Sequence, residues 1–215
     1  LITFNLTQDE PFYFDVNATD PDNDSIVYGY NAYMDYTHTT EWEVFTIQNT
    51  TGVIKFTPLN DDVTYPELHE VLVSIIDNTS QHNSALIKFN VSNVNDPPNI
   101  TGYTPTNLTL SIHENDSIGF NFNYNATDPD LQYGDSLTNV WIMDGVNQTN
   151  NHSWIYSPGF CEPLYRNITL IVWDSEGLFD RVEWNVTVIN VNRPPVFNWS
   201  NPIHNITWPE DTELI

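Results

Sequence analysis

The feature that most constrains the fold is a short phrase that the chain uses twice. Residues 93–98 read NVNDPP, and residues 190–195 read NVNRPP. A proline pair has no backbone N–H to donate and holds φ near −65°, so it cannot continue a central strand. It forms a stiff, extended joint instead. Because the phrase recurs after about one hundred residues, it indicates tandem domains rather than the turns of a solenoid.

Other repeated elements place the domain boundaries. The phrase NATDPD occurs at 17–22 and again at 125–130. A glutamate recurs at nearly the same spacing, as Glu10, Glu114 and Glu210. We therefore predict two full units and the opening of a third. Their bounds are 1–96, 97–193 and 194–215.

The pattern inside each unit predicts short strands. In residues 120–127, FNFNYNAT, the apolar positions alternate with Asn121, Asn123 and Asn125, which is the two-residue period of a strand. Similar short runs are separated by Asn, Asp, Gly and Pro, and no amphipathic helix of useful length occurs. IQNTTGVIKF predicts a hairpin, with Gly52 available for a positive φ. These patterns predict an all-β protein made of tandem β-sandwiches.

The charge balance excludes one class of partner. The chain has 29 acids and five bases, a formal net charge of −24. Nucleic-acid binding requires Lys and Arg for the phosphates, so we expect no nucleic-acid partner. The acids favour a surface that gathers cations, and plain solubility explains them equally well. No apolar run approaches the roughly 18–20 residues of a membrane helix. We therefore expect no membrane insertion in this segment, and we interpret it as a mature protein or a piece of a longer one.

No catalytic residues are predicted. Cys161 is the one cysteine, so no disulfide can form within the chain, and we expect it to pack as a small core residue. A catalytic thiol would need a histidine partner, and none is near in sequence. The six histidines lack metal-binding spacing, and neither a phosphate loop nor a nucleophile elbow occurs. We therefore predict that the segment is not an enzyme.

Asparagine carries the strongest compositional signal. The chain has 28 Asn and 35 Ser or Thr, for which chance placement gives about four or five Asn-x-Ser/Thr sequons, yet it has sixteen. This excess predicts N-linked glycans and export from the cell. The alternative is that Asn and Thr are polar filler on strands. The predicted glycosylation sites are Asn5, Asn17, Asn23, Asn49, Asn78, Asn90, Asn99, Asn107, Asn115, Asn125, Asn147, Asn151, Asn167, Asn185, Asn198 and Asn205.

The order of several motifs resembles a cadherin or bacterial/archaeal cadherin-like repeat. After Glu10 come VNATDPD, FTIQNTTGVI, PLNDD, VLVSIID and NVNDPP, in the order of the family's motifs. The resemblance covers all of the first unit. The second unit keeps Glu114, NATDPD, ITLIVWD and the linker, but its middle, VWIMDGVNQTNNHSW, lacks the Thr-Gly hairpin. The resemblance implies Ig/cadherin-like Greek-key β-sandwiches joined by Pro-Pro linkers.

The resemblance also implies a calcium site at the first joint. Calcium requires six to eight oxygen ligands. The implied ligands are Glu10, Asp62, Asn93, Asn95, Asp96, Asp128, Asp130 and Asp174. The linker departs from the family pattern at Asn93 and Pro97, and Asn60 replaces an acid, so we expect fewer or weaker ions. The alternative is that the Asp residues of DPD form Asx-turns.

The second joint differs by one charge. Arg193 stands where Asp96 stands in the first linker. A guanidinium at that position is expected to replace a cation by pairing with carboxylates, Glu114 among them. Calcium is therefore less expected at this joint than at the first.

Together these features predict a non-enzymatic, heavily N-glycosylated structural protein at the outside of the cell, as part of an S-layer, surface filament or stalk. Sequon density without disulfides is more typical of an archaeal than of an animal protein. The alternatives are an adhesin arm that recognises a partner or glycan, and a spacer in a large secreted enzyme. We expect self-assembly into a fibre or lattice. Residues 194–215 are then either the first strand of a further repeat or a donor strand for a neighbouring subunit.

The glycan prediction can be checked by intact mass. We expect the native chain to exceed 24.8 kDa by the mass of many glycans and to return close to that value after glycan release. Mass spectrometry before and after release measures both. A native mass equal to that of the bare chain would contradict glycosylation.

Overall fold

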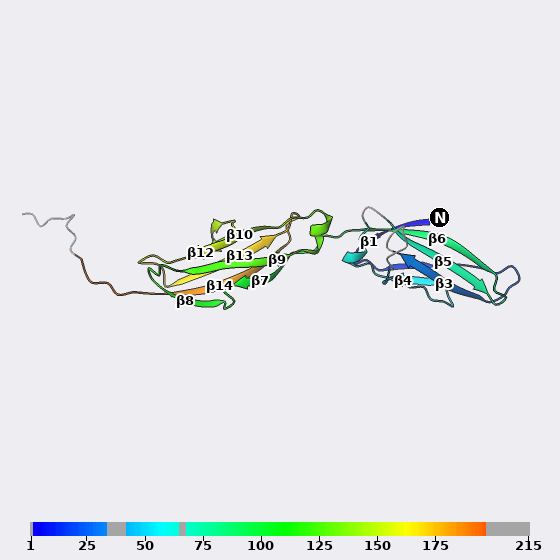
Figure 1. Ribbon diagram of the computed structural model, residues 1–215, viewed down its shortest axis with the longest axis horizontal. Helices are drawn as coiled ribbons and strands as arrows, with labels where there is room; N and C mark the ends of the chain where they lie inside the picture. The colour runs from blue at the N-terminus through cyan, green and yellow to red at the C-terminus, as the bar shows by residue number, and fades with distance from the viewer. Residues whose placement is uncertain (1, 34–41, 65–67, 197–215) are drawn as a thin grey trace, which may run out of the picture.

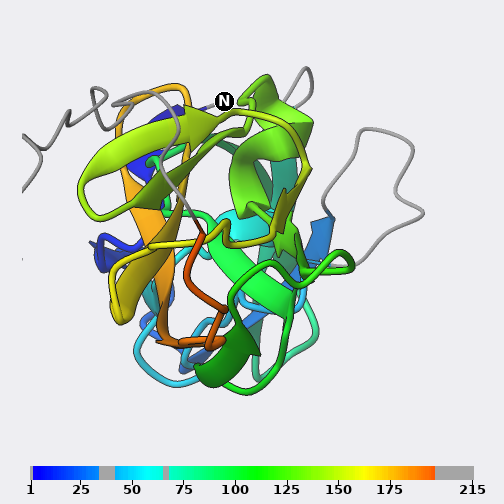
Figure 2. The same cartoon turned by 90° about the vertical axis from the view of Figure 1, so that its left-hand side faces the viewer.

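The computed structural model describes residues 2–33, 42–64 and 68–196. Within these ranges the chain forms fourteen strands and two short 3-10 helices, which confirms the predicted all-β fold. None of the helices in the described part is long and apolar enough to cross a membrane. Two β-sandwiches follow one another along an extended molecule and are joined by one linker (Figure 1). Viewed end-on, the second sandwich lies in front of the first (Figure 2).

The first sandwich is built from β1 to β6. Its strands are β1 (Ile2–Thr7), β2 (Phe12–Asp15), β3 (Ile26–Tyr33), β4 (Val53–Phe56), β5 (His69–Asp77) and β6 (His82–Ser92). One sheet has the order β1-β6-β5-β3, with β1 parallel to β6, and β2 pairs with β4 in the other. Helix η1 (Asn60–Asp62) follows β4. The core between the sheets is aromatic, and Phe45, Phe56 and Phe89 pack around Trp42.

The second sandwich is built from β7 to β14. Its strands are β7 (Asn99–Thr104), β8 (Thr109–His113), β9 (Phe120–Thr127), β10 (Thr138–Met143), β11 (Val146–Thr149), β12 (Ser153–Tyr156), β13 (Tyr165–Trp173) and β14 (Phe179–Ile189). Their sheet orders are β11-β10-β13-β14-β8 and β12-β9-β7. Helix η2 (Pro129–Tyr133) follows β9. A separate core forms around Phe122, Trp141 and Trp184, so each sandwich buries its own apolar surface.

Buried tryptophans tie each core to a nearby loop. Trp42 Nε1 donates to Asp62 Oδ1 at 2.7 Å, and Trp184 Nε1 donates to the carbonyl of Pro105 at 2.8 Å. Each indole therefore buries its large apolar body without leaving its N–H unpaired. These cores hold the sandwiches together although Cys161, the one cysteine of the chain, forms no disulfide.

Some local expectations were wrong or lie outside the described residues. The hairpin turn has Gly52 at φ 74°, but residues 43–48 contribute one isolated bridge, Ile47 to Ile54, instead of a strand. Cys161 is exposed in a turn at φ 65°, so it is not a core residue as expected. The strand predicted within 194–215 falls in the range 197–215, which is not described.

The separate cores predict separate responses to a core mutation. Trp184→Ala should remove about 3–5 kcal/mol from the unfolding free energy of the second sandwich, because a fully buried side chain is lost. The first sandwich should unfold as before. Urea unfolding followed by tryptophan fluorescence measures both transitions, and the exposed Tyr13→Ala is the matched control. A single transition shifted as a whole would contradict independent cores.

Candidate metal centre at the joint between the sandwiches

The linker contacts both sandwiches through hydrogen bonds. Asn95 Nδ2 donates to Asp174 Oδ2 at 2.7 Å, and the Asp96 amide donates to Asp130 Oδ2 at 2.6 Å. Tyr133 Oη reaches across and donates to the carbonyl of Asn60 at 2.8 Å. Through these bonds the end of the second sandwich that carries η2 contacts the linker and the first sandwich. Figure 1 shows this end facing the first sandwich.

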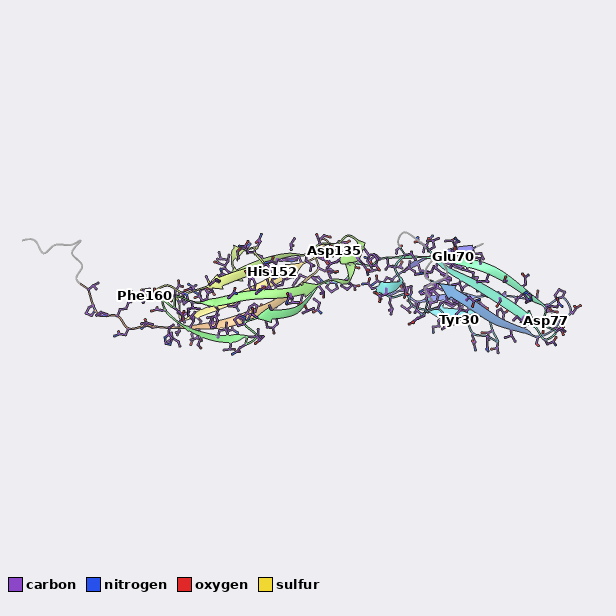
Figure 3. All side chains as sticks on the ribbon, viewed as in Figure 1. Tyr30, Glu70, Asp77, Asp135, His152 and Phe160 are labelled. Atoms are coloured by element: carbon purple, nitrogen blue, oxygen red, sulfur yellow. The ribbon has the colours of Figure 1, made fainter. Side chains whose placement is uncertain are left out.

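Three carboxylates converge at this end. Asp128 follows β9, Asp135 follows η2 and Asp174 follows β13, and each offers an oxygen within 4.8 Å of the others. Figure 3 labels Asp135 at the end of the second sandwich that faces the first. Asp128 and Asp174 are buried, and Asp135 is half-buried. The cluster thus combines three loops at one end of the sandwich.

One oxygen of each carboxylate has a structural task. Asp128 Oδ1 caps η2 by accepting from the Asp130 amide at 2.8 Å, which is the Asx-turn that the alternative interpretation expected. Asp174 Oδ1 accepts from three amides of the β13–β14 turn. Asp135 Oδ1 accepts from the amide and hydroxyl of Ser175. The backbone therefore holds the cluster in place before any ligand arrives.

The remaining oxygens indicate a cation. Asp128 Oδ2, Asp130 Oδ1 and Asp135 Oδ2 are buried and accept no hydrogen bond. Among the described residues, none of the ion pairs includes these acids. Burying ionised carboxylates without partners costs free energy, and hard carboxylate oxygens are what Ca²⁺ prefers. The residues present therefore fit a calcium ion.

The charges of the cluster perturb one another. Burial raises the pKa of Asp128, and the charges of Asp135, Asp130 and Asp174 raise it further. Hydrogen bonds from Ser175 lower the pKa of Asp135. The ionised form of Asp128 is therefore disfavoured, and a cation placed between these carboxylates would relieve the repulsion.

The structure brings together only part of the predicted ligand set. Asn95, Asp96, Asp128, Asp130 and Asp174 meet at the joint.

The first sandwich contributes less than the resemblance implied. Asp62 is buried, but its oxygens accept from Trp42 Nε1 and the Leu59 amide. Glu10 and Asn93 are exposed.

Gln8 holds the position that the sequence repeat assigned to Glu10. The backbone N–H of Gln8 donates to the carbonyl of Ser92, and the side-chain Oε1 of Gln8 accepts from the backbone N–H of Val94 at 3.2 Å. Glu114 repeats this arrangement in the second sandwich, accepting from Val191. The equal spacing of the glutamates therefore placed the equivalent of Glu114 two residues too late, at Glu10 instead of Gln8. At this position the first sandwich presents a neutral side-chain amide.

Asp135 is the ligand candidate that the sequence did not reveal. It lies five residues beyond the DPD phrase, after η2 and Gly134, and no repeat in the first unit marks it. Its neighbour Ser175 belongs to a different loop. A weak signal existed, because a Gly-Asp pair after a short helix is a typical turn.

The first sandwich carries the same acids at its far end. Asp20 Oδ1 accepts from the Asp22 amide at 2.8 Å, as Asp128 does from Asp130. Asp77, labelled in Figure 3 at the end away from the joint, caps its turn as Asp174 does. Asp20 and Asp77 are only half-buried, and Asp22 is exposed. One motif therefore becomes a buried cluster only where the linker and the other sandwich cover it.

Arg193 has different partners from those expected. Its guanidinium lies over the ring of Phe160, 4.1 Å from the centroid, and Nη2 contacts Cys161 Sγ at 3.2 Å. Glu114 instead accepts from the amides of Cys161 and Val191. Among the described residues, Arg193 forms no ion pair with Glu114.

The sequon asparagines lie on the surface wherever the structure describes them. Asn90 is half-buried, and the other thirteen described asparagines are exposed. Asn198 and Asn205 lie outside the described residues. The exposed side chains are open to solvent, which a glycan requires.

The comparisons with known proteins support the fold. No family model matches the sequence, and no curated protein sequence is similar to it. A crystal structure of human CDH23 EC21-23 has a TM-score of 0.50 and 21% identity, covering 87% of this chain and 67% of that one. Protocadherin Gamma B2 extracellular cadherin domains 1-5 give 0.49 and 15%, covering 88% of this chain and 38% of that one. The chain is structurally similar to tandem cadherin extracellular domains, and at this identity the similarity shows the fold alone.

The unpartnered oxygens predict opposite effects of one neutralising substitution. Asp128→Asn keeps the cap on η2 and removes a buried charge, so without calcium the melting temperature should rise by about 2–5 °C. Calcium at a hundredfold excess over its Kd should add about 2.7 kcal/mol to the wild type and little to the variant. Calorimetry with calcium and with chelator measures both, and Glu176→Gln, an exposed acid beside the cluster, is the control. A variant that keeps the full calcium gain would exclude Asp128 as a ligand.

The raised pKa of Asp128 predicts a pH dependence. Below that pKa the carboxyl binds a proton, which relieves the buried charge and competes with calcium. The calcium-dependent gain in melting temperature should therefore shrink as the pH falls from 7 to about 4.5. Without calcium, the contribution of Asp128 to stability should increase over the same range. A calcium gain that grows on acidification would contradict this sign.

Proposed function

We propose that this chain is a non-enzymatic, N-glycosylated structural segment outside the cell, whose first joint is stiffened by calcium. One observation carries the proposal: three buried carboxylate oxygens at the joint have no partner. An ordinary sandwich end would not keep such charges buried. The fold is consistent with a structural or adhesive role.

Some residues at the joint would hold the ion, and others hold the linker. Asp128, Asp130 and Asp135 would hold the ion from the second sandwich through their unpartnered oxygens. Asp174 would join them, since one of its oxygens lies within 4.8 Å of those of Asp128 and Asp135. Calcium supplies the positive charge that these carboxylates lack. The linker is fixed to the same acids by Asn95 and by the Asp96 amide. An interaction that draws these acids together would therefore also restrain the linker.

Two surface properties support an extracellular role. The net charge of −24 keeps the chain soluble and repels nucleic acid, and thirteen of the described sequon asparagines are exposed. Glycans on most of these positions would cover both sandwiches. A stiff, coated rod of this kind suits an S-layer, surface filament or stalk better than a catalytic domain. An adhesin arm remains the second candidate, because it needs the same stiff rod.

Small-angle scattering tests the stiffened joint. With calcium the two sandwiches should keep one end-to-end distance, and chelation should broaden the distribution of distances because the acids repel. Asp130→Ala should give the broad distribution under both conditions. If the distribution of end-to-end distances in the wild type does not change with calcium, the proposal of a calcium-stiffened joint is wrong.

Deletion of residues 198–215 tests how the chain assembles. If this tail connects subunits, the shortened protein should stay monomeric where the full chain forms polymers. Light scattering of both forms measures the difference. A shortened protein that polymerises as the full one does would show that the tail is not the connector.

A further inference from the structure

Two pairs of sequon asparagines face each other across neighbouring strands. Asn5 of β1 is opposite Asn90 of β6, and Asn167 of β13 is opposite Asn185 of β14. In the registers of the described strands, no other two sequon asparagines stand directly opposite. In the antiparallel pair of Asn167 and Asn185 the Cβ atoms are about 4.5–5.5 Å apart. In the parallel pair the side chains of Asn5 and Asn90 are hydrogen-bonded at 3.1 Å, and a substituted sugar ring is wider than either gap. Two glycans at one pair would therefore collide.

The first pair is already joined by its own side chains. Asn90 Nδ2 donates to Asn5 Oδ1 at 3.1 Å, and Asn90 Oδ1 accepts from Thr64 Oγ1 at 2.9 Å. Asn90 is half-buried, whereas Asn5 is exposed. The nitrogen of Asn5 is open, whereas that of Asn90 donates to its neighbour, so Asn5 is the member of the pair that a sugar reaches first.

The second pair is distinguished by the hydroxyl of each sequon. Thr169, which completes the sequon of Asn167, is 9% exposed, and its Oγ1 donates to Asn167 Oδ1 at 3.1 Å. Thr187, which completes the sequon of Asn185, is more open and lies opposite Tyr165, a residue that is 70% exposed. An exposed aromatic face is a surface that a sugar can cover. The geometry therefore favours Asn185.

We propose that each pair carries one glycan, on Asn5 and on Asn185, and that Asn90 and Asn167 stay unmodified in the folded protein. The proposal rests on the N-glycosylation proposed above. In the transfer, the asparagine Nδ2 bonds the anomeric carbon of a phosphate-linked sugar donor. The phosphate carrier leaves with the bonding electron pair, and the amide gives up one proton. Asn90 is excluded by the sugar on Asn5, and Asn167 is excluded by the burial of Thr169.

Site-resolved mass spectrometry of peptides from the native protein tests the assignment. The ratio of modified to bare peptide should exceed ten at Asn5 and Asn185 and should be below one tenth at Asn90 and Asn167. Asn17 faces no other sequon asparagine in these registers and is the internal reference for glycosylation. Modified fractions that sum well above one within either pair would overturn the proposal.

Variants that delete one sequon but keep its asparagine separate the two reasons. Thr7→Ala leaves the Asn5 side chain in place and frees the space beside Asn90, so modification of Asn90 should rise at least tenfold. Thr187→Ala should remove the glycan of Asn185 while Asn167 stays bare, because Thr169 remains buried. The control Thr19→Ala, which deletes the sequon of Asn17, should change neither pair. An Asn90 that stays bare in Thr7→Ala, or an Asn167 that becomes modified in Thr187→Ala, would overturn the corresponding assignment.

The reference site separates this inference from the proposed function. A bare Asn17 together with bare pairs would end both the glycoprotein proposal and the pairing. A modified Asn17 together with two modified members of one pair would end the pairing alone and leave the glycoprotein proposal standing.

Discussion

The structure depends on like charges that are held together at one end of the second sandwich. Asp128, Asp135 and Asp174 are fixed by backbone amides and a serine, so they cannot move apart without breaking those bonds. The linker closes over them through Asn95 and Asp96. Repulsion among buried carboxylates is strong where water is excluded. A cation placed among these carboxylates would therefore offset a strong repulsion at the joint.

The two sides of this joint are chemically unequal. The second sandwich supplies the carboxylates that have unpartnered oxygens, whereas the first sandwich contacts the linker through neutral amides, among them Gln8 and Asn60, whose Oδ1 is also buried without a partner. Gln8 and Asn60 both donate to Asp96, so the first sandwich contacts the linker by hydrogen bonds rather than by charge. An ion held mainly by one sandwich would stiffen the joint through the linker.

The period of about one hundred residues and the two-residue alternation predicted the fold, because both follow from backbone geometry that local sequence controls. The site was predicted in part. Asp128, Asp130 and Asp174 belong to repeated phrases, and the sequence revealed them. Asp135 is held in the site by a hydrogen bond from Ser175, which belongs to a different loop. A contact between two loops leaves no local pattern in the sequence. The equivalence of Gln8 and Glu114 depends on strand register, which equal spacing of glutamates misrepresented.

At the far end of the second sandwich, a buried carboxylate has hydrogen-bond partners for both of its oxygens. Both oxygens of Glu114 accept backbone amides, from Cys161 and Val191, so its buried charge is satisfied without a cation. Arg193 lies on Phe160 and adds a positive charge close by. At the first joint neither condition holds, since the acids there have free oxygens and no basic partner among the described residues. The exchange of Asp96 for Arg193 between the two linkers therefore accompanies a change from an end whose buried carboxylates keep free oxygens to one whose buried glutamate is satisfied by backbone amides.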